Sequence, residues 1–140
     1  MNPKFFSVEE ADRLVSFLEN SLERIQSHKR SYLWLQKEIS ILSLIVGCGA
    51  EGTNTDAVLL EEKTEKCRSV AASIEKDIAR INETGCVLRD VDQGLVDFYS
   101  ILDGNVVFLC WKKGEESVMF WHSTNTGFKG RQRIFRPSSM

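Results

Sequence analysis

The sequence contains no stretch of about 18 consecutive apolar residues, which is the length that a membrane-spanning helix requires. Its first residues also lack the basic-then-apolar pattern and the small-residue cleavage site of a secretory leader. Histidine is scarce, since His28 and His122 are the only two, and they form no His-x-x-x-His pair. These absences predict a soluble, cytoplasmic protein with no membrane partner. We interpret His28 as part of a helix surface or seam.

The cysteines also lack the spacing of a metal motif. The chain has four, separated by 19, 19 and 24 positions, whereas a zinc knuckle or ribbon needs closely paired cysteines. In a cytosolic protein they are expected to be reduced and to pack as small, buried apolar side chains. We therefore expect neither a metal nor a cofactor. The four are Cys48, Cys67, Cys86 and Cys110.

A basic excess is missing as well. The chain has 18 Lys and Arg against 20 Asp and Glu, a formal net charge of -2, so we expect no nucleic-acid partner. The only local excess is a C-terminal run without intervening acids, which is either a solvated tail or an anion contact. Its members are Lys129, Arg131, Arg133 and Arg136.

The first 85 residues carry the pattern of two helices within what we expect to be a single domain, 1–140. Ser7 and Glu10 have the spacing of a capping box, and Phe6 precedes them. Apolar residues then recur with heptad-like spacing, which predicts one long helix over 8–46. A second pattern over 57–81 ends before Gly85, a residue favoured just beyond a helix end. The two helices should pack as an antiparallel hairpin.

Two segments near the hairpin turn carry their own expectations. The stretch Ile41–Val46 is apolar on nearly all sides of its helix, which indicates that other parts of the structure enclose it. Residues 47–55, with three glycines, form a turn or a disordered loop.

The remaining residues, 86–140, have the pattern of a small antiparallel β subdomain with a basic tail. Alternating residues over 96–99 predict a brief strand after a turn at 89–94, and Asp103-Gly104 is a hairpin turn signal. Residues 106–111 and 118–122, rich in β-branched and aromatic side chains, predict two further strands. Both are apolar on both faces, so the helices should cover one face and a partner chain or the C-terminal segment the other. The fold class is α+β.

A candidate binding site falls in this half. Histidine titrates near neutrality, a buried carboxylate can act as acid or base, and arginine offers a planar fork to an oxyanion. Tryptophan would supply an apolar wall, and the segment Gly127–Arg131 is read as a tight turn that presents its arginine. The candidates are Asp97, Trp111, Glu115, His122 and Arg131.

The strand register decides whether these side chains converge, and the sequence allows two registers. With a two-residue turn at Lys113-Gly114, His122 shares a face with Trp111. With a five-residue loop, residue 111 faces 117, and His122 shares a face with Phe108 and Cys110 instead.

Several ordered blocks resemble an uncharacterised prokaryotic family known as domain of unknown function 2203. The likeness covers nearly the whole chain, from the opening at Phe6–Ala11 onward. The chain departs from the family pattern at Tyr99, where proline is usual, and at Ser123–Asn125, where acids are usual. The resemblance implies no activity. Its blocks are Gly94–Phe98, Leu109–Trp111, Gly114-Glu115, Trp121-His122 and Gly127–Arg131.

Two functions from different classes follow. Two long amphipathic helices present more apolar seam than a small sheet can cover, which predicts an oligomeric interaction or assembly module, specifically a homodimer. The alternative is a small-molecule or anion-binding site, or a weak enzyme, in the β half that uses His122 and Arg131.

Overall fold

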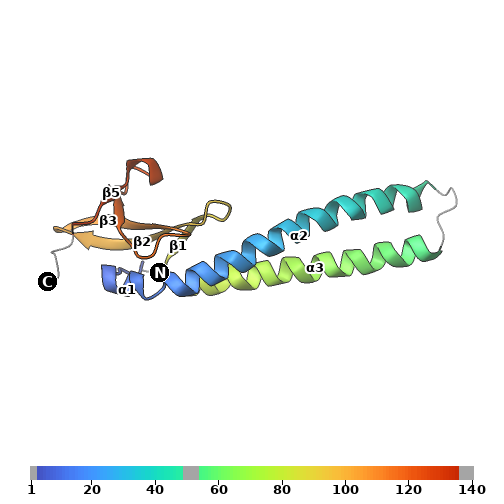
Figure 1. The fold of residues 1–140 in the computed structure, drawn as a ribbon, viewed down its shortest axis with the longest axis horizontal. Coiled ribbons are helices and arrows are strands. Elements are labelled where there is room, and N and C mark those ends of the chain that lie inside the picture. The colour runs from blue at the N-terminus through green and yellow to red at the C-terminus, as the bar shows by residue number, and fades with distance from the viewer. Residues whose placement is uncertain (1–2, 49–53, 136–140) are drawn as a thin grey trace. The chain divides into compact units, whose positions relative to one another are not determined.

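The protein is described here by a computed structural model covering residues 3–48 and 54–135. It has two packed long helices followed by a five-stranded antiparallel sheet, which confirms the α+β prediction (Figure 1). Within these residues, no helix has the length and apolar content to cross a membrane. The elements are α1 (Val8–Asp12), α2 (Val15–Gly47), α3 (Asn54–Glu83), β1 (Val87–Asp90), β2 (Leu95–Leu102), β3 (Asn105–Lys112), β4 (Phe120–Ser123), η1 (Phe128–Gly130) and β5 (Gln132–Arg133).

The chain divides into two compact units. The sheet unit comprises Met1–Glu23 and Ala79–Met140, and the helical unit comprises Arg24–Ile78. The ends of α2 and α3 near the sheet therefore belong to the sheet unit, whereas the sequence pattern placed the border at residue 85. The single-domain interpretation of 1–140 stays a prediction.

The N-terminal helix begins as the sequence predicts but ends early. The capping box is present in both directions, since the Ser7 hydroxyl accepts from the Glu10 N–H and the Glu10 carboxylate accepts from the Ser7 N–H. The expected single helix over 8–46 is wrong, because the chain turns between α1 and α2. There the Leu14 N–H donates to the Ala11 carbonyl, three residues back, as in a 3-10 turn. Asp12, at the end of α1, accepts a hydrogen bond from the Val118 N–H at 2.7 Å through a carboxylate oxygen.

The helical unit is an antiparallel pair. Side chains of the heptad-like pattern face inward, and an ion pair between Arg24 and Asp77 joins α2 to α3. The expectation that other parts of the structure enclose Ile41–Val46 is not met within the described residues, since Ile41 and Leu44 are 59% and 69% exposed. A two-helix pair has one interface, so only one stripe of each helix is covered. The buried apolar residues of this unit are Ile25, Leu35, Leu42 and Cys67.

The loop between the helices is shorter than expected, because α2 runs through Gly47 and α3 begins at Asn54. The prediction of disorder falls largely on residues 49–53, which lie outside the described residues. Cys48, expected to be buried, is exposed, while the other three cysteines are buried, and none of the four forms a disulfide.

The sheet has the order β1-β2-β3-β4-β5, with each strand antiparallel to its neighbour. The predicted hairpin turn at Asp103-Gly104 is confirmed, and both residues have positive φ, as a two-residue type I′ turn requires. The turn predicted over 89–94 is wrong at its start, because β1 continues through Asp90.

The register between β3 and β4 differs from both alternatives. Phe108 lies opposite His122 and Cys110 opposite Phe120, so the connection is two residues longer than the five-residue loop. A shift by two residues keeps every side chain on its face, because strand side chains alternate with period two. The face predicted by the five-residue alternative is therefore correct, with His122 beside Phe108 and Cys110.

Different segments of the chain pack against the two faces of the sheet. The inner face is apolar and packs against the N-terminal segment, where the Phe6 and Phe98 rings meet edge to face at 5.2 Å. The Phe6 N–H donates to Tyr99, and the Ser100 hydroxyl donates to Phe6. The outer face holds Asp97, Cys110 and His122, and the segment after β4 returns over it. Buried residues of the inner face are Val96, Phe98, Leu109 and Trp111.

Candidate functional site

The outer face of the sheet carries a polar cluster that four adjacent strands assemble. Arg89 comes from β1, Asp97 from β2, Cys110 from β3 and His122 from β4, and register places Asp97 directly opposite Cys110. These side chains line a cavity of about 320 Å³, with Thr124, Thr126 and Phe128 of the returning segment. Aromatic and hydroxyl groups thus surround a small charged centre.

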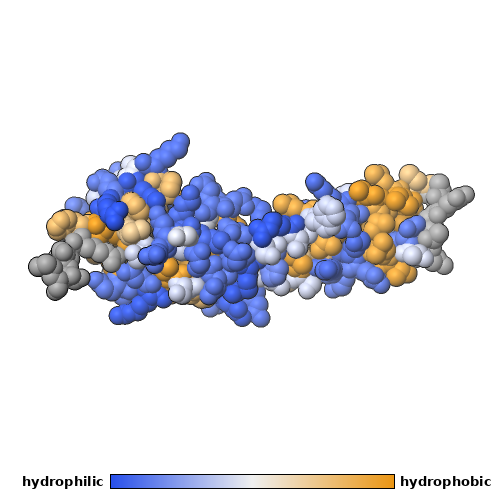
Figure 2. Space-filling view, viewed as in Figure 1, coloured by the Kyte–Doolittle hydropathy of each residue, from blue (hydrophilic) through white to orange (hydrophobic). Residues whose placement is uncertain are grey.

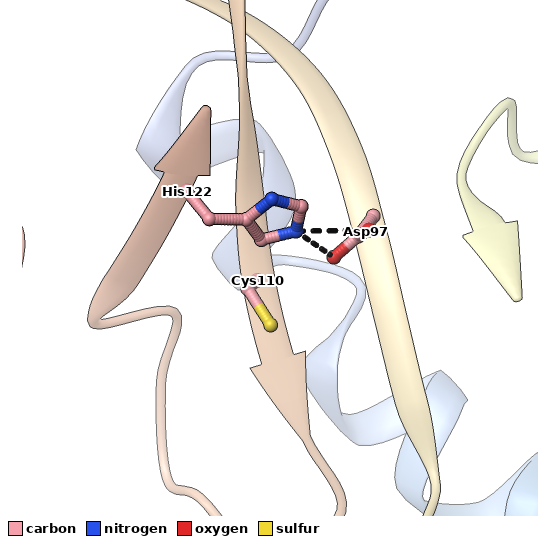
Figure 3. A group of neighbouring side chains, drawn as sticks. All are labelled: Asp97, Cys110 and His122. Atoms are coloured by element: carbon pink, nitrogen blue, oxygen red, sulfur yellow. Dashed lines mark hydrogen bonds and ion pairs between the residues drawn. The ribbon is translucent and has the colours of Figure 1, made fainter. Parts of the chain in front are cut away.

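His122 and Asp97 form the buried centre of the cluster. Their side chains are 3% and 5% exposed, and His122 Nε2 lies 3.0 Å from Asp97 Oδ2 and 3.1 Å from Oδ1 (Figure 3). The other ring nitrogen, Nδ1, lies 2.8 Å from the Ser123 carbonyl oxygen. A carbonyl oxygen can only accept, so Nδ1 carries a hydrogen and Nε2 is the nitrogen that faces the carboxylate.

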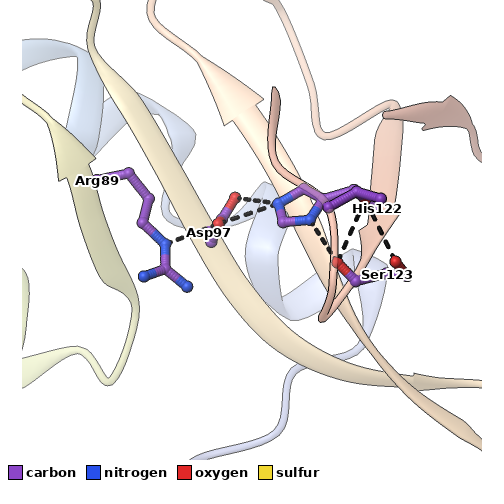
Figure 4. A network of polar contacts seen from close by, with 5 residues as sticks. Arg89, Asp97, His122 and Ser123 are labelled. Carbon is purple, nitrogen blue, oxygen red and sulfur yellow. Dashed lines mark hydrogen bonds and ion pairs between the residues drawn. The ribbon is translucent and has the colours of Figure 1, made fainter. Parts of the chain in front are cut away.

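Arg89 completes the charge arrangement. Its Nε donates to Asp97 Oδ2 at 2.9 Å, and its guanidinium stacks on the Phe108 ring with 4.8 Å to the centroid. Figure 4 shows the two Nη nitrogens directed away from Asp97. The Arg89 side chain is 46% exposed and lines the cavity, while its Nε is held in place by Asp97.

Cys110 is the third potential ligand or nucleophile in the cluster. Burial, followed by the negative charge of Asp97, raises the pKa of its thiol to about 12. A nucleophilic cysteine needs a lowered pKa and a histidine nitrogen directed at its sulfur. Here both nitrogens of His122 already face oxygen atoms, so the cluster does not have the geometry of a Cys-His-Asp nucleophilic relay.

Glu115 and Arg131 form a separate pair beside the cluster. Arg131 donates from Nη1 and Nη2 to the two Glu115 oxygens at 3.1 and 2.8 Å and stacks on Phe120 and Phe128. Burial opposes the charge of Arg131, but the hydrogen bonds and charge of Glu115 outweigh it and raise the pKa of the guanidinium. Arg131 is thus not part of a solvated tail. Arg131 also lowers the pKa of the Cys110 thiol, although burial raises that pKa by more, so the pair and the cluster influence each other.

Trp111 lies on the inner face and does not take part. It is fully buried, and its indole N–H donates to the Glu115 carbonyl at 2.9 Å. Of the five residues predicted from the sequence, Asp97 and His122 meet, Glu115 and Arg131 pair with each other, and Trp111 belongs to the core.

Two residues of the cluster were not among the sequence candidates. Arg89 was placed in a turn, and Cys110 was taken for a buried apolar residue. The observed pairing of Asp97 with Cys110, and of Phe108 with His122, puts Cys110 on the same face as Asp97 and His122. The alternation of side chains would have found Cys110 once the register was known.

These features define an α+β protein that combines a helical hairpin with a polar cavity on an antiparallel sheet. The family model described as "Uncharacterized conserved protein (DUF2203)" matches residues 4–134, and the chain belongs to this family. Comparison with curated proteins found no match, and comparison with solved structures found none either.

Proposed function

We propose that the protein binds a small molecule with a carboxylate or phosphate group in the cavity on the outer face of the sheet. The observation that carries the proposal is Arg89, whose guanidinium is oriented by Asp97 and Phe108 while both Nη donors remain directed outward. A guanidinium held in one plane offers two parallel hydrogen bonds to an oxyanion, and little side-chain entropy is lost on binding.

The surrounding surface supports a ligand of modest size. A cavity of about 320 Å³ is at the small end of ligand sites in proteins, which span about 300 to 1,000 Å³. Phe108 and Phe128 offer apolar contact, and the hydroxyls of Thr124 and Thr126 offer hydrogen bonds. The ligand is therefore a small molecule with one anionic end and a short apolar body.

Thermal stability in the presence of inorganic phosphate and a series of short carboxylates tests this function. A ligand that binds only the folded state stabilises it by about 2.7 kcal/mol at 100 times its Kd, so the melting temperature should rise with ligand concentration. Arg89→Gln should remove the rise. Arg68→Gln, at an exposed arginine of the helical unit, should keep it. An equal rise in wild type and Arg89→Gln, or no rise with any anion, would contradict the proposal.

A second function, self-association through the helical unit, is favoured by a different observation. Large apolar side chains are exposed on the second half of α2 and the first turns of α3, and Figure 2 shows apolar surface gathered toward the ends that flank residues 49–53. Contiguous apolar surface of this kind marks interaction sites in proteins. The exposed residues are Leu33, Trp34, Ile41, Leu44, Ile45, Val58 and Leu59.

A second copy of the same chain is the proposed partner. Two hairpins that bring their apolar stripes together form a four-helix bundle, which covers the side chains that one hairpin leaves exposed. Light scattering at micromolar concentration should give twice the chain mass. Leu44→Glu should give the monomer mass, whereas Ser43→Glu, which adds the same charge at an adjacent exposed position, should remain dimeric. A wild-type protein that is monomeric throughout this range would refute self-association.

A further inference from the structure

We infer that Asp97, Cys110 and His122 form a binding site for a divalent transition metal of the zinc class. One carboxylate oxygen, the thiol sulfur and a ring nitrogen all lie within 4.8 Å of one another, and all three residues are buried. Figure 3 shows the His122 ring directed at Asp97, with Cys110 on the strand between them. The inference goes beyond the proposed anion binding and does not depend on it.

The histidine is already set for coordination. Its Nδ1 hydrogen bond to the Ser123 carbonyl leaves the Nε2 lone pair pointing at Asp97. Two lone pairs at 3.0 Å would repel each other, so Nε2 either carries a proton and donates to Asp97 or binds a metal ion that the carboxylate also binds. A ring held by a backbone carbonyl at its far nitrogen is the usual support for a metal-binding histidine.

The carboxylate is equally well supported. Asp97 Oδ2 accepts from Arg89, which leaves Oδ1, 3.1 Å from His122 Nε2, to coordinate the metal. In a tetrahedral site with bonds of about 2.0 Å, two ligand atoms lie about 3.3 Å apart, so this nitrogen and oxygen have nearly the required separation. The sulfur, within 4.8 Å, needs a small side-chain shift.

The ligand types select the metal. Sulfur and imidazole nitrogen favour zinc, cobalt and iron over calcium and magnesium, which prefer oxygen ligands. Three protein ligands leave a fourth position open, as in catalytic zinc sites. Because all three ligands line the cavity, this position is accessible to a water molecule or to an anionic ligand.

The expectation of no metal arose from the spacing of ligands along the chain. Residues 97, 110 and 122 are too far apart in sequence to resemble a zinc motif, and only the register of β2, β3 and β4 brings them together. A site of this kind is assembled by pairing between strands and has no local signature.

Titration of the chelator-treated full-length protein with Co²⁺ tests the inference, because a cobalt–thiolate bond gives a charge-transfer band in the near ultraviolet. We expect one Co²⁺ per chain with this band, and displacement by Zn²⁺. Cys110→Ser should abolish the band, and His122→Asn should weaken binding. Cys48→Ser, which removes the exposed thiol, should leave the spectrum unchanged. Circular dichroism of each variant verifies folding.

Arg89→Gln separates this inference from the proposed function. The substitution removes the contact for the anion but only a supporting hydrogen bond for the metal, so it should lower metal affinity by about 10-fold. Absence of the band in wild type, its persistence in folded Cys110→Ser, or its loss in Cys48→Ser would each overturn the metal site. Failure of phosphate or carboxylates to bind would leave this result unaffected.

Discussion

Asp97 joins the polar side chains on the outer face of the sheet, because it contacts both Arg89 and His122. Its carboxylate is almost fully buried and accepts from Arg89 while it contacts His122. A buried carboxylate is tolerated only when its oxygen atoms have partners, and the two cationic or donor groups here supply them. Removal of its charge would leave Arg89 and His122 without their negatively charged partner.

Asp97→Asn should therefore lower the free energy of unfolding by about 3 kcal/mol, the loss expected when one partner of a buried charged pair is removed. Urea denaturation monitored by tryptophan fluorescence measures the change. Asp103→Asn is the matched control, because it makes the same substitution at an exposed residue of the turn between β2 and β3 and should change stability by less than about 0.5 kcal/mol. Equal losses in the two variants would show that Asp97 has no special role.

Thiol accessibility gives a second prediction for single residues. In the folded, metal-free protein, a disulfide reagent should modify Cys48 alone, because the other three cysteines are buried. A thiol reacts as the thiolate, and Cys110, with a pKa of about 12, should stay unmodified even at about pH 9. Cys48→Ser should abolish the rapid reaction, and unfolding should release the remaining thiols. Rapid modification of Cys110 at neutral pH would be incompatible with its buried position.

At the level of elements, turns with positive φ position the strands. Gly94, with φ of 69°, precedes β2, and its carbonyl accepts from the Lys113 N–H at 2.9 Å. A Cβ atom at Gly94 would lie only 2.5 Å from the Lys113 Cβ. Gly104, with φ of 80°, has open space around it.

Substitution of these two glycines separates the cost of positive φ from the cost of a steric clash. Gly104→Ala should destabilise the protein by about 1 kcal/mol, because a side chain disfavours positive φ. Gly94→Ala should cost at least about 1 kcal/mol more, because the added methyl group also displaces Lys113 and the strand end that carries it. Thermal denaturation of the two variants gives the comparison. A smaller effect at Gly94 would show that the turn can shift without loss.

The elements themselves were largely predictable, and their junctions were not. Heptad-like spacing and the Ser7–Glu10 pair are local signals, and they identified the helices and the first cap. The turn between α1 and α2 has no local signal, because it is stabilised by the contact of Asp12 with Val118, more than a hundred positions away. The β3–β4 register depends on the length of an irregular connection, so the sequence left the partners of His122 undecided.

At the scale of the whole molecule, the helical unit exposes several large apolar side chains. The sequence predicted that the apolar end of α2 is enclosed, and within the described chain nothing covers Ile41 or Leu44. The proposed self-association would enclose these side chains and so reconcile the pattern with the structure. It would also make stability depend on protein concentration, because association stabilises the folded state by mass action.

The melting temperature of the wild-type protein should therefore rise with protein concentration across the micromolar range. In Leu44→Glu it should be independent of concentration, and in Ser43→Glu it should rise as in wild type. Differential scanning calorimetry at several concentrations provides the measurement. A concentration-independent wild-type transition would mean that this surface does not bind a second chain under these conditions.

The contacts of Phe6 with Ser100 and of Asp12 with Val118 span 94 and 106 positions. As the chain leaves the ribosome, α2 and α3 can pair as soon as both have emerged, since their contacts need no later residue. The contacts of Phe6 have to wait until β2 has been synthesised, and the contact of Asp12 has to wait for the loop beyond β3. During that interval Phe6 and Ala11, both buried in the finished protein, are open to solvent and prone to non-native contacts.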